Sequence, residues 1–246
     1  MKIAIVGYGF VGRSTELLFF QPGVEILIHD PNLGRTISDW SGVDYTFICV
    51  PTPVDENGKC LSTTVVDEVV KFVRGKTTKA KRGGQIVVRS TLGPEQLNSE
   101  WIYMPEFLKE RTWKEDTLSY HTPVVFGTKV DVSDLCILLP MKKVYVVTPQ
   151  EAAVYKLSRN ALLATKVMFA NHLYDVCEKE ECDFDSVIKL YMDEGEFGYS
   201  HWDVPGPDGK RGFGGKCLPK DTTHFANLIS DQNMFTQILE DNDITR

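Results

Sequence analysis

Positive charge is scarce in this chain of 246 residues. It has 27 lysines and arginines against 34 aspartates and glutamates, which gives a net charge of −7. Proteins that bind nucleic acid usually carry a basic excess, so we do not expect nucleic acid as a partner. An anionic ligand would have to be held by local cations and by backbone N–H groups against this acidic background.

Long apolar runs are also missing. The longest, such as residues 3–6 and 86–88, are far too short to span a bilayer, and we expect no contact with a membrane. A strand pattern follows Met1 and Lys2 directly, which leaves no room for a signal peptide. The sequence therefore predicts a cytoplasmic protein.

Patterns of disulfide or metal binding are absent as well. The six cysteines form no CxxC pair and show no Cys/His spacing typical of a metal site. We expect free thiols, most of them small core side chains, and no bound metal.

Short β-type runs alternate with helical patterns in the first half of the chain. The strand-like runs are residues 2–6, 25–29, 45–50, 85–89, 101–104, 124–127 and 143–147, and helical spacing covers residues 10–20 and 62–81. Such alternation predicts an α/β fold of the Rossmann type, a doubly wound parallel sheet with helices on both faces.

The pattern changes after residue 147. The sequence Thr148-Pro149-Gln150-Glu151 is a capping box with proline at the first helical position. No proline or glycine follows up to Cys182, so we expect a helix of roughly thirty residues. Its apolar stripe is formed by Leu157, Ala161, Ala164, Met168 and Asn171. Further helices are expected from Asp183 and near Pro219, which predicts two domains, residues 1–147 and a small all-helical domain over residues 148–246.

A glycine-rich motif, GYGFVG, joins the first predicted strand to the first helix. Gly7 would allow the tight turn, Gly9 the approach of a pyrophosphate, and Gly12 the packing of helix on strand. Asp30 ends the second strand, 18 residues later, where a carboxylate accepts the ribose hydroxyls and repels a 2′-phosphate. This motif predicts NAD rather than NADP as cofactor; the alternative is a structural turn with Asp30 as a solvated strand end.

The loops after the third and fourth strands lie where an open parallel sheet holds its ligand. They carry Pro-Thr-Pro and Ser-Thr, and either could also be an ordinary loop. The residues that we expect at the cofactor are Gly7, Gly9, Phe10, Val11, Gly12, Asp30, Pro51, Thr52, Ser90 and Thr91.

Residues suited to chemistry cluster further along the chain. Lys156 and Asn160 are four apart, so they share one face of the long helix. The apolar residues around Asn160 favour a covered face over a solvated one. In the segment Met104–Glu110, two carboxylates lie four apart and one could activate a water; a solvated turn is the alternative.

The segment GFGGKCLPKD gives the strongest signal. Its glycines let backbone approach a ligand, and Pro219 suits the first turn of a helix, which places Cys217 at the helix N-terminus. There the helix dipole and Lys216 or Lys220 would favour the thiolate. A thiolate beside a nicotinamide can attack an aldehyde, and the adduct can lose a second hydride to become a thioester.

Together these motifs resemble the UDP-glucose/GDP-mannose 6-dehydrogenase family over residues 1 to about 225. In family order they are GYGFVG, Asp30, the VPTP turn, the Ser-Thr turn, PEFLxE, KxxxNAxxATK and GFGGxCxPKD. The resemblance implies oxidation of a nucleotide sugar to the uronic acid in two hydride transfers to NAD. UDP-glucose is the first candidate for the substrate. The resemblance also implies a role in polysaccharide biosynthesis.

The resemblance also implies a role for each catalytic residue. Cys217 would be the nucleophile, Lys156 would stabilise the oxyanion and Asn160 would hold the sugar. Asp221 and Thr91 would position a water that takes the alcohol proton. Thioester hydrolysis would be assisted by Glu110. The residues expected at the substrate are Glu106, Phe107, Leu108, Lys156, Asn160, Phe213 and Gly214.

The chain departs from the family pattern in three ways. The family has a third, Rossmann-like domain, whereas 25 residues follow Asp221 here (246 − 221), so we expect that domain to be absent. Between Asp30 and the third strand there is room for only a short helix. Lys216 stands where the family usually has serine. The long helix carries the dimer contact in the family, so a homodimer through residues 148–182 is expected.

Two other functions stay open. The first is a single-step dehydrogenase of the related β-hydroxyacid type, which has a Lys-xxx-Asn pair but needs no cysteine. The second is a truncated relative that binds NAD without catalysis. The GFGGKCLPKD segment argues against the first, and the filled chemical positions argue against the second.

Overall fold

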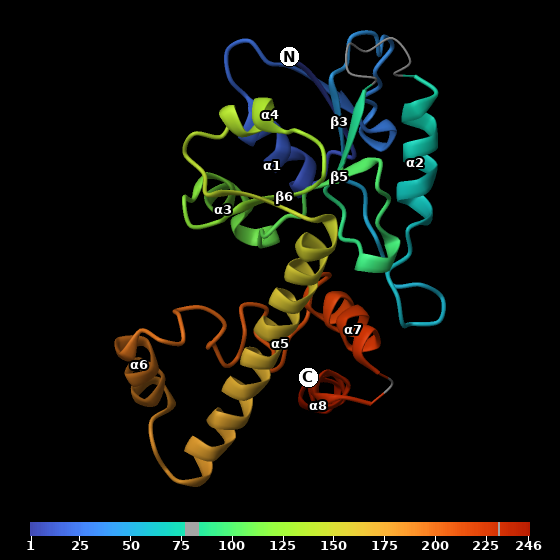
Figure 1. The fold of residues 1–246 in the computed structure, drawn as a ribbon. Coiled ribbons are helices and arrows are strands. Elements are labelled where there is room, and N and C mark those ends of the chain that lie inside the picture. The colour runs from blue at the N-terminus through green and yellow to red at the C-terminus, as the bar shows by residue number, and fades with distance from the viewer. Residues whose placement is uncertain (77–83, 231) are drawn as a thin grey trace. The chain divides into compact units, whose positions relative to one another are not determined.

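The computed structural model describes residues 1–76, 84–230 and 232–246 (Figure 1). These residues form two compact units. The first comprises residues 1–53 and 61–156, and the second comprises residues 54–60 and 157–246. The change of unit along the chain falls within one long helix, α5 (Pro149–Lys179), and the boundary predicted from the sequence falls at the start of that helix.

The first unit contains one sheet of seven strands, in the order β2-β1-β3-β4-β5-β6-β7. Their bounds are β1 (Lys2–Val6), β2 (Glu25–His29), β3 (Tyr45–Ile48), β4 (Gln85–Val88), β5 (Trp101–Tyr103), β6 (Val124–Gly127) and β7 (Val144–Val147). All seven strands were predicted. The prediction of a wholly parallel sheet holds only for the first five, because β6 pairs with β5 in antiparallel fashion and β7 follows β6 in parallel.

The order of the strands creates a switch point beside β1. The chain passes from β1 to β2 on one side and then returns to the other side of β1 for β3. Only a short 3₁₀ turn, η1 (Pro31–Leu33), lies at the start of this return, in line with the short helix expected there. In open α/β sheets ligands bind outside the carboxyl ends of the strands at such a point, which is where the glycine-rich turn lies.

The sheet buries a core on each face. On one face, α2 (Thr64–Arg74) places its valines at positions 66, 70 and 73 against the sheet, together with the start of α5. On the other face lie α1 (Phe10–Phe19) and α4 (Ser133–Ile137), with α3 (Trp113–Leu118) next to α1. The helix predicted over residues 62–81 is confirmed for α2, and its positions 77–81 lie outside the described residues.

The capping box predicted for α5 is formed. The backbone N–H and the hydroxyl of Thr148 both donate to a carboxylate oxygen of Glu151 at 2.8 Å, and the N–H of Glu151 donates back to Thr148 Oγ1 at 3.3 Å. This cap satisfies donors of the first turn that the helix itself leaves unpaired. The start of α5 was therefore predictable from four adjacent residues.

The second unit is helical and packs around the apolar stripe of α5. The predicted stripe is fully buried, at Leu157, Ala161, Ala164, Met168 and Asn171. Its other helices are α6 (Phe184–Glu194), whose N-cap is the predicted Asp183, α7 (Leu218–Ile229) and α8 (Met234–Thr245). Helices α7 and α8 pack on the stripe through Leu218, Ile238 and Leu239. Among the described residues no helix is long and apolar enough to cross a membrane.

Candidate active site

The turn between β1 and α1 has the backbone that a phosphate site requires. Gly7 has a φ of +85°, and a Cβ on Gly12 would lie 2.1 Å from the carbonyl oxygen of Gly7, so the close packing there needs glycine. A Cβ on Gly9 would meet nothing within 4 Å among the described residues. No described side chain caps the first turn of α1. The N–H groups at the start of α1 thus have no capping side chain among the described residues, and Gly9 leaves free space beside them. Such N–H groups suit an anion.

The carboxylate of Asp30 is fixed beside this turn. Its Oδ2 accepts a hydrogen bond from the N–H of Tyr8 at 2.7 Å, and its Oδ1 accepts one from the N–H of Asn32 at 3.2 Å. Each carboxylate oxygen can accept a second hydrogen bond, so ribose hydroxyls can still be bound. The guanidinium of Arg35 lies 4.7 Å from the centre of the Tyr8 ring and adds a positive charge at the same place.

Hydroxyl side chains gather at the carboxyl ends of β3 and β4. Thr52, Ser90 and Thr91 are all buried. The Ser90 hydroxyl donates to the carbonyl oxygen of Val50 at 2.6 Å, which ties the two strand ends together. Pro51 is exposed beside them. These residues lie where the sequence placed them, at the ligand-binding edge of the sheet.

Glu106 and Lys156 form a buried ion pair. The Nζ of Lys156 lies 3.0 Å from Oε1 of Glu106, and the two side chains are only 2% and 6% exposed. Oε2 of Glu106 accepts from the N–H of Leu108 at 2.7 Å. Burial by itself would raise the pKa of Glu106, but Lys156, the Leu108 N–H and Arg89 outweigh burial and hold this pKa below its ordinary value. Glu106 is therefore an ionised acceptor at neutral pH.

The remainder of the PEFLKE segment separates into a covered part and an exposed part. Phe107 is buried, with its ring 5.2 Å from that of Tyr155 and 5.8 Å from the ammonium of Lys156. Glu110, in contrast, is exposed at the start of a 3₁₀ turn, η3 (Glu110–Thr112). The two carboxylates of the motif thus occupy different environments, and the buried one already has partners.

In the second unit, Asn160 and Asp221 meet across α5 and α7. Asn160 Nδ2 donates to Asp221 Oδ2 at 2.6 Å, and both residues are buried. Lys220 Nζ lies 2.6 Å from Asp221 Oδ1. Arg159 donates to Asn160 Oδ1 at 3.3 Å, which orients the amide so that its NH₂ faces the carboxylate. A buried carboxylate held by an amide and an ammonium can accept a proton through a water while keeping its position.

Cys217 lies at the N-cap position of α7, as predicted, and is half-buried. The turn before it is crowded. Phe213 is buried, and a Cβ on Gly214 would lie 2.3 Å from Nη2 of Arg246. The glycines of the motif thus allow close packing against a guanidinium, in addition to any approach of substrate.

Two buried asparagines hold this turn, and sequence reasoning did not identify their role. Asn171 Oδ1 accepts from the N–H of Gly212 at 3.1 Å, and Asn242 Oδ1 accepts from the N–H of Phe213 at 2.6 Å. An asparagine inside the apolar stripe of α5 was a visible signal for Asn171. Nothing in the sequence around Asn242 indicated its contact.

The structure therefore brings the predicted residues together in separate groups, each within one unit. The first unit holds the glycine turn, Asp30 and the hydroxyls at the strand ends, and separately the pair Glu106–Lys156. The second unit holds Asn160 with Asp221, and the turn that carries Cys217. Within the first unit, Glu110 is not brought to the buried pair.

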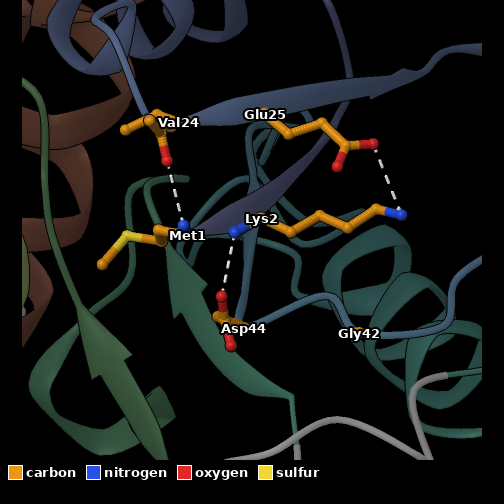
Figure 2. Close-up of a pocket in the computed structure, with 7 residues that line it drawn as sticks. Met1, Lys2, Val24, Glu25, Gly42 and Asp44 are labelled. Carbon is orange, nitrogen blue, oxygen red and sulfur yellow. Dashed lines mark hydrogen bonds and ion pairs between the residues drawn. The ribbon is translucent and has the colours of Figure 1, made fainter.

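An open hollow of ≈ 480 Å³ lies at the opposite edge of the sheet, at the amino ends of the strands (Figure 2). Its polar groups satisfy one another: the N–H of Lys2 donates to Asp44 at 2.8 Å, and the ammonium of Lys2 lies 3.4 Å from Glu25. Because ligands of such sheets bind at the carboxyl ends, we do not assign the active site to this hollow.

The sequence of the chain is similar to those of known dehydrogenases. Residues 150–243 match the central domain of the UDP-glucose/GDP-mannose dehydrogenase family. A UDP-glucose 6-dehydrogenase of Campylobacter jejuni is 25% identical over 296 aligned positions, which include all of this chain and 73% of that relative. Residues 150–243 thus carry the central domain of this family, and the whole chain is similar in sequence to members of it. The 296 positions exceed the 246 residues of the chain, so the relative carries inserted segments.

Several solved structures have the same fold as this chain. A UDP-D-ManNAc dehydrogenase from Pyrococcus horikoshii has a TM-score of 0.78 at 17% identity, over 100% of this chain and 69% of its own. A 3-hydroxyisobutyrate dehydrogenase from Mycobacterium tuberculosis has a TM-score of 0.66 at 16% identity, over 97% of this chain and 91% of its own. The fold alone therefore does not separate nucleotide-sugar dehydrogenases from hydroxyacid dehydrogenases, and the site must do so.

Proposed function

We propose that this protein oxidises the C6 primary alcohol of a nucleotide sugar to a carboxylate, with NAD as the oxidant. UDP-glucose is the first candidate for the substrate. The observation that carries this proposal is the glycine-rich turn that presents Cys217 at the start of α7, in the same unit as the buried pair of Asn160 and Asp221. A hydroxyacid dehydrogenase needs no nucleophile, whereas oxidation from alcohol to acid without release of the aldehyde does.

The glycine turn and Asp30 are the residues that would hold NAD. Uncapped N–H groups of α1 suit the pyrophosphate, and the carboxylate of Asp30 suits the two ribose hydroxyls. The same carboxylate repels a 2′-phosphate. When bound, NAD supplies the acceptor for one hydride, so the two oxidations consume two molecules of NAD.

In the first oxidation the chain has to remove a proton and hold the oxygen. Asp221 would position the water that takes the proton of the alcohol. Asn160 would hold the sugar hydroxyl, and Lys156 would stabilise the developing oxyanion. An ammonium has three N–H donors, so Lys156 can serve the substrate while it remains paired with Glu106.

In the second oxidation Cys217 would attack the aldehyde carbon to form a thiohemiacetal. Loss of the second hydride leaves a thioester on the same sulfur. Water then releases the acid, assisted by Glu110 with Glu106 nearby in sequence. The solvent exposure of Glu110 is compatible with activation of water.

The proposal is tested by NADH formation on a panel of UDP- and GDP-sugars. We expect two NADH for each sugar consumed and the uronic acid as product, with NAD preferred over NADP. One NADH for each molecule of a small hydroxyacid would instead establish the β-hydroxyacid alternative, with which the shared fold of the 3-hydroxyisobutyrate dehydrogenase is compatible. Binding of NAD without turnover of any sugar would establish the non-catalytic alternative.

We further propose that the protein is a homodimer through α5. Three large apolar side chains, Leu162, Phe169 and Val176, are seven residues apart on this helix and are 66%, 47% and 54% exposed. A seven-residue apolar spacing is the pattern with which one helix packs along another.

Leu162→Glu is expected to convert the dimer to a monomer, because a carboxylate would be buried in the contact without a partner. Loss of a central apolar anchor weakens association by about 30-fold or more. Sedimentation equilibrium measures the change, with Lys189→Glu on the exposed face of α6 as the matched control. An unchanged dimer in the Leu162→Glu variant would place the contact elsewhere.

A further inference from the structure

We propose that the first unit binds one small anion, of the size of chloride, in a small cavity lined in part by the PEFL segment. The cavity measures ≈ 20 Å³, which is room for about one water-sized particle. It is lined by Ser14, Leu18, Arg89, Thr117, Thr122, Lys142 and residues 104–108. This proposal does not rest on the proposed function.

The cavity contains a buried guanidinium with unmet donors. Arg89, at the end of β4, is 3% exposed. Its Nη1 donates to Thr15 Oγ1 at 2.9 Å, whereas its Nε is buried and has no hydrogen-bond partner in the described part of the chain. A buried cation is costly unless it is paired and hydrogen-bonded. Burial lowers the pKa of Arg89, the charge of Glu106 opposes this in part, and no carboxylate of the described residues forms a direct ion pair with Arg89.

A second cation faces the same cavity. The ammonium of Lys142 donates to the carbonyl oxygen of Thr117 at 2.9 Å and to that of Ser119, which leaves one of its three N–H groups for another acceptor. Burial and the charge of Arg89 both lower the pKa of Lys142. The two cations therefore repel each other across the cavity, and an anion between them would remove that repulsion.

Hydroxyl groups also line the cavity, but they are engaged with each other. Thr117 donates its one hydroxyl hydrogen to the carbonyl oxygen of Trp113 at 2.5 Å, so Ser14 Oγ, 2.7 Å from Thr117 Oγ1, donates to Thr117. Thr122 also lines the cavity. A halide ion accepts hydrogen bonds without donating any, which fits a site whose charged donors are Arg89 and Lys142.

Glu106 is the one carboxylate among the lining residues of this cavity, and its charge is already balanced. One oxygen pairs with Lys156 at 3.0 Å, and the other accepts the N–H of Leu108 at 2.7 Å. Glu106 also opposes the charge of Arg89, and Asp116 that of Lys142, but among the described residues neither carboxylate forms a direct ion pair with these cations. A water molecule would fill the same volume but would leave the repulsion between the two cations in place, so we favour the anion.

Wild-type protein gives the direct test. Crystals grown with bromide as the only halide are expected to show an anomalous peak inside the cavity. At constant ionic strength, kept with gluconate, the unfolding temperature is expected to rise by about 3–5 °C for each tenfold increase in chloride above its dissociation constant. Gluconate is too large for this cavity. No anomalous peak, with an unfolding temperature that does not depend on chloride, would show that the cavity holds water and would overturn the proposal.

Two variants locate the effect. Arg89→Met keeps the length of the side chain and is expected to abolish the chloride dependence, whereas Lys143→Met removes an exposed cation next to the cavity residue and should leave the dependence unchanged. Should Arg89→Met fail to fold, Lys142→Met is expected to weaken chloride binding at least tenfold. Chloride dependence that persists unchanged in Lys142→Met would place the anion at another site.

Discussion

Replacing Cys217 by alanine is expected to stop the oxidation before the acid is formed. Without the thiol no thiohemiacetal can form, so the second hydride has no tetrahedral donor held at the nicotinamide. We expect formation of the uronic acid to fall by a factor of about 10³ or more, as is usual when a covalent nucleophile is removed. The readout is the amount of acid and of NADH formed per sugar in a single turnover, with product identified by mass spectrometry.

The matched control is Cys182→Ala, which removes an exposed free thiol from the same unit. It should keep full activity. Alanine at residue 217 leaves binding of the cofactor and the removal of the first proton in place, so up to one NADH per active site can still form. Two NADH per sugar from the Cys217→Ala variant would show that oxidation to the acid does not need the thiol and would overturn the thioester mechanism.

Much of the fold was predictable because its signals are local. Gly7 and Gly12 are required by contacts within the same turn, and the cap of α5 is made by Thr148 and Glu151, three residues apart. The stripe from Leu157 to Asn171 follows the period of one helix. In each case the physical cause and the residues that satisfy it lie within a few turns of the chain, so the sequence pattern reports both.

The features that were not predicted depend on partners far away in sequence. The pairing of Glu106 with Lys156, 50 residues later, was not predicted. Asn242 accepts the N–H of Phe213, 29 residues away in sequence. The antiparallel pairing of β6 with β5 consists of one bridge, between Tyr103 and Gly127. No periodicity or motif encodes such contacts, because they arise only once the elements pack.

The ion pair of Glu106 and Lys156 leads to the largest expected effect on stability. Lys156→Met keeps the volume of the side chain and leaves the Glu106 carboxylate buried without its cation. Breaking a buried pair in this way costs about 3–5 kcal/mol in the free energy of unfolding of the first unit at neutral pH. The double variant Lys156→Met/Glu106→Gln leaves no uncompensated charge and should recover most of that loss.

The pH dependence separates this explanation from a simple packing defect. In the wild type the pKa of Glu106 is held below its ordinary value, so its contribution to stability is present above the ordinary carboxyl pKa and is lost as the pH falls through the folded value. In Lys156→Met burial dominates and raises the pKa of Glu106. The variant then loses most stability at neutral pH, and the difference from wild type shrinks as the pH falls and Glu106 takes up a proton.

Urea unfolding of the wild type, Lys156→Met, Glu106→Gln and the double variant between pH 4 and pH 8 measures this difference. Lys109→Met is the matched control, because it breaks the pair with Asp116, in which the lysine side chain is 60% exposed. That variant should change stability by less than about 1 kcal/mol at any pH. If Lys156→Met and the double variant lose the same stability at every pH, the charge of Glu106 is not the cause, and the loss belongs to packing around Phe107. Recovery in the double variant that is confined to neutral pH would instead establish Lys156 as the counter-ion that keeps Glu106 ionised.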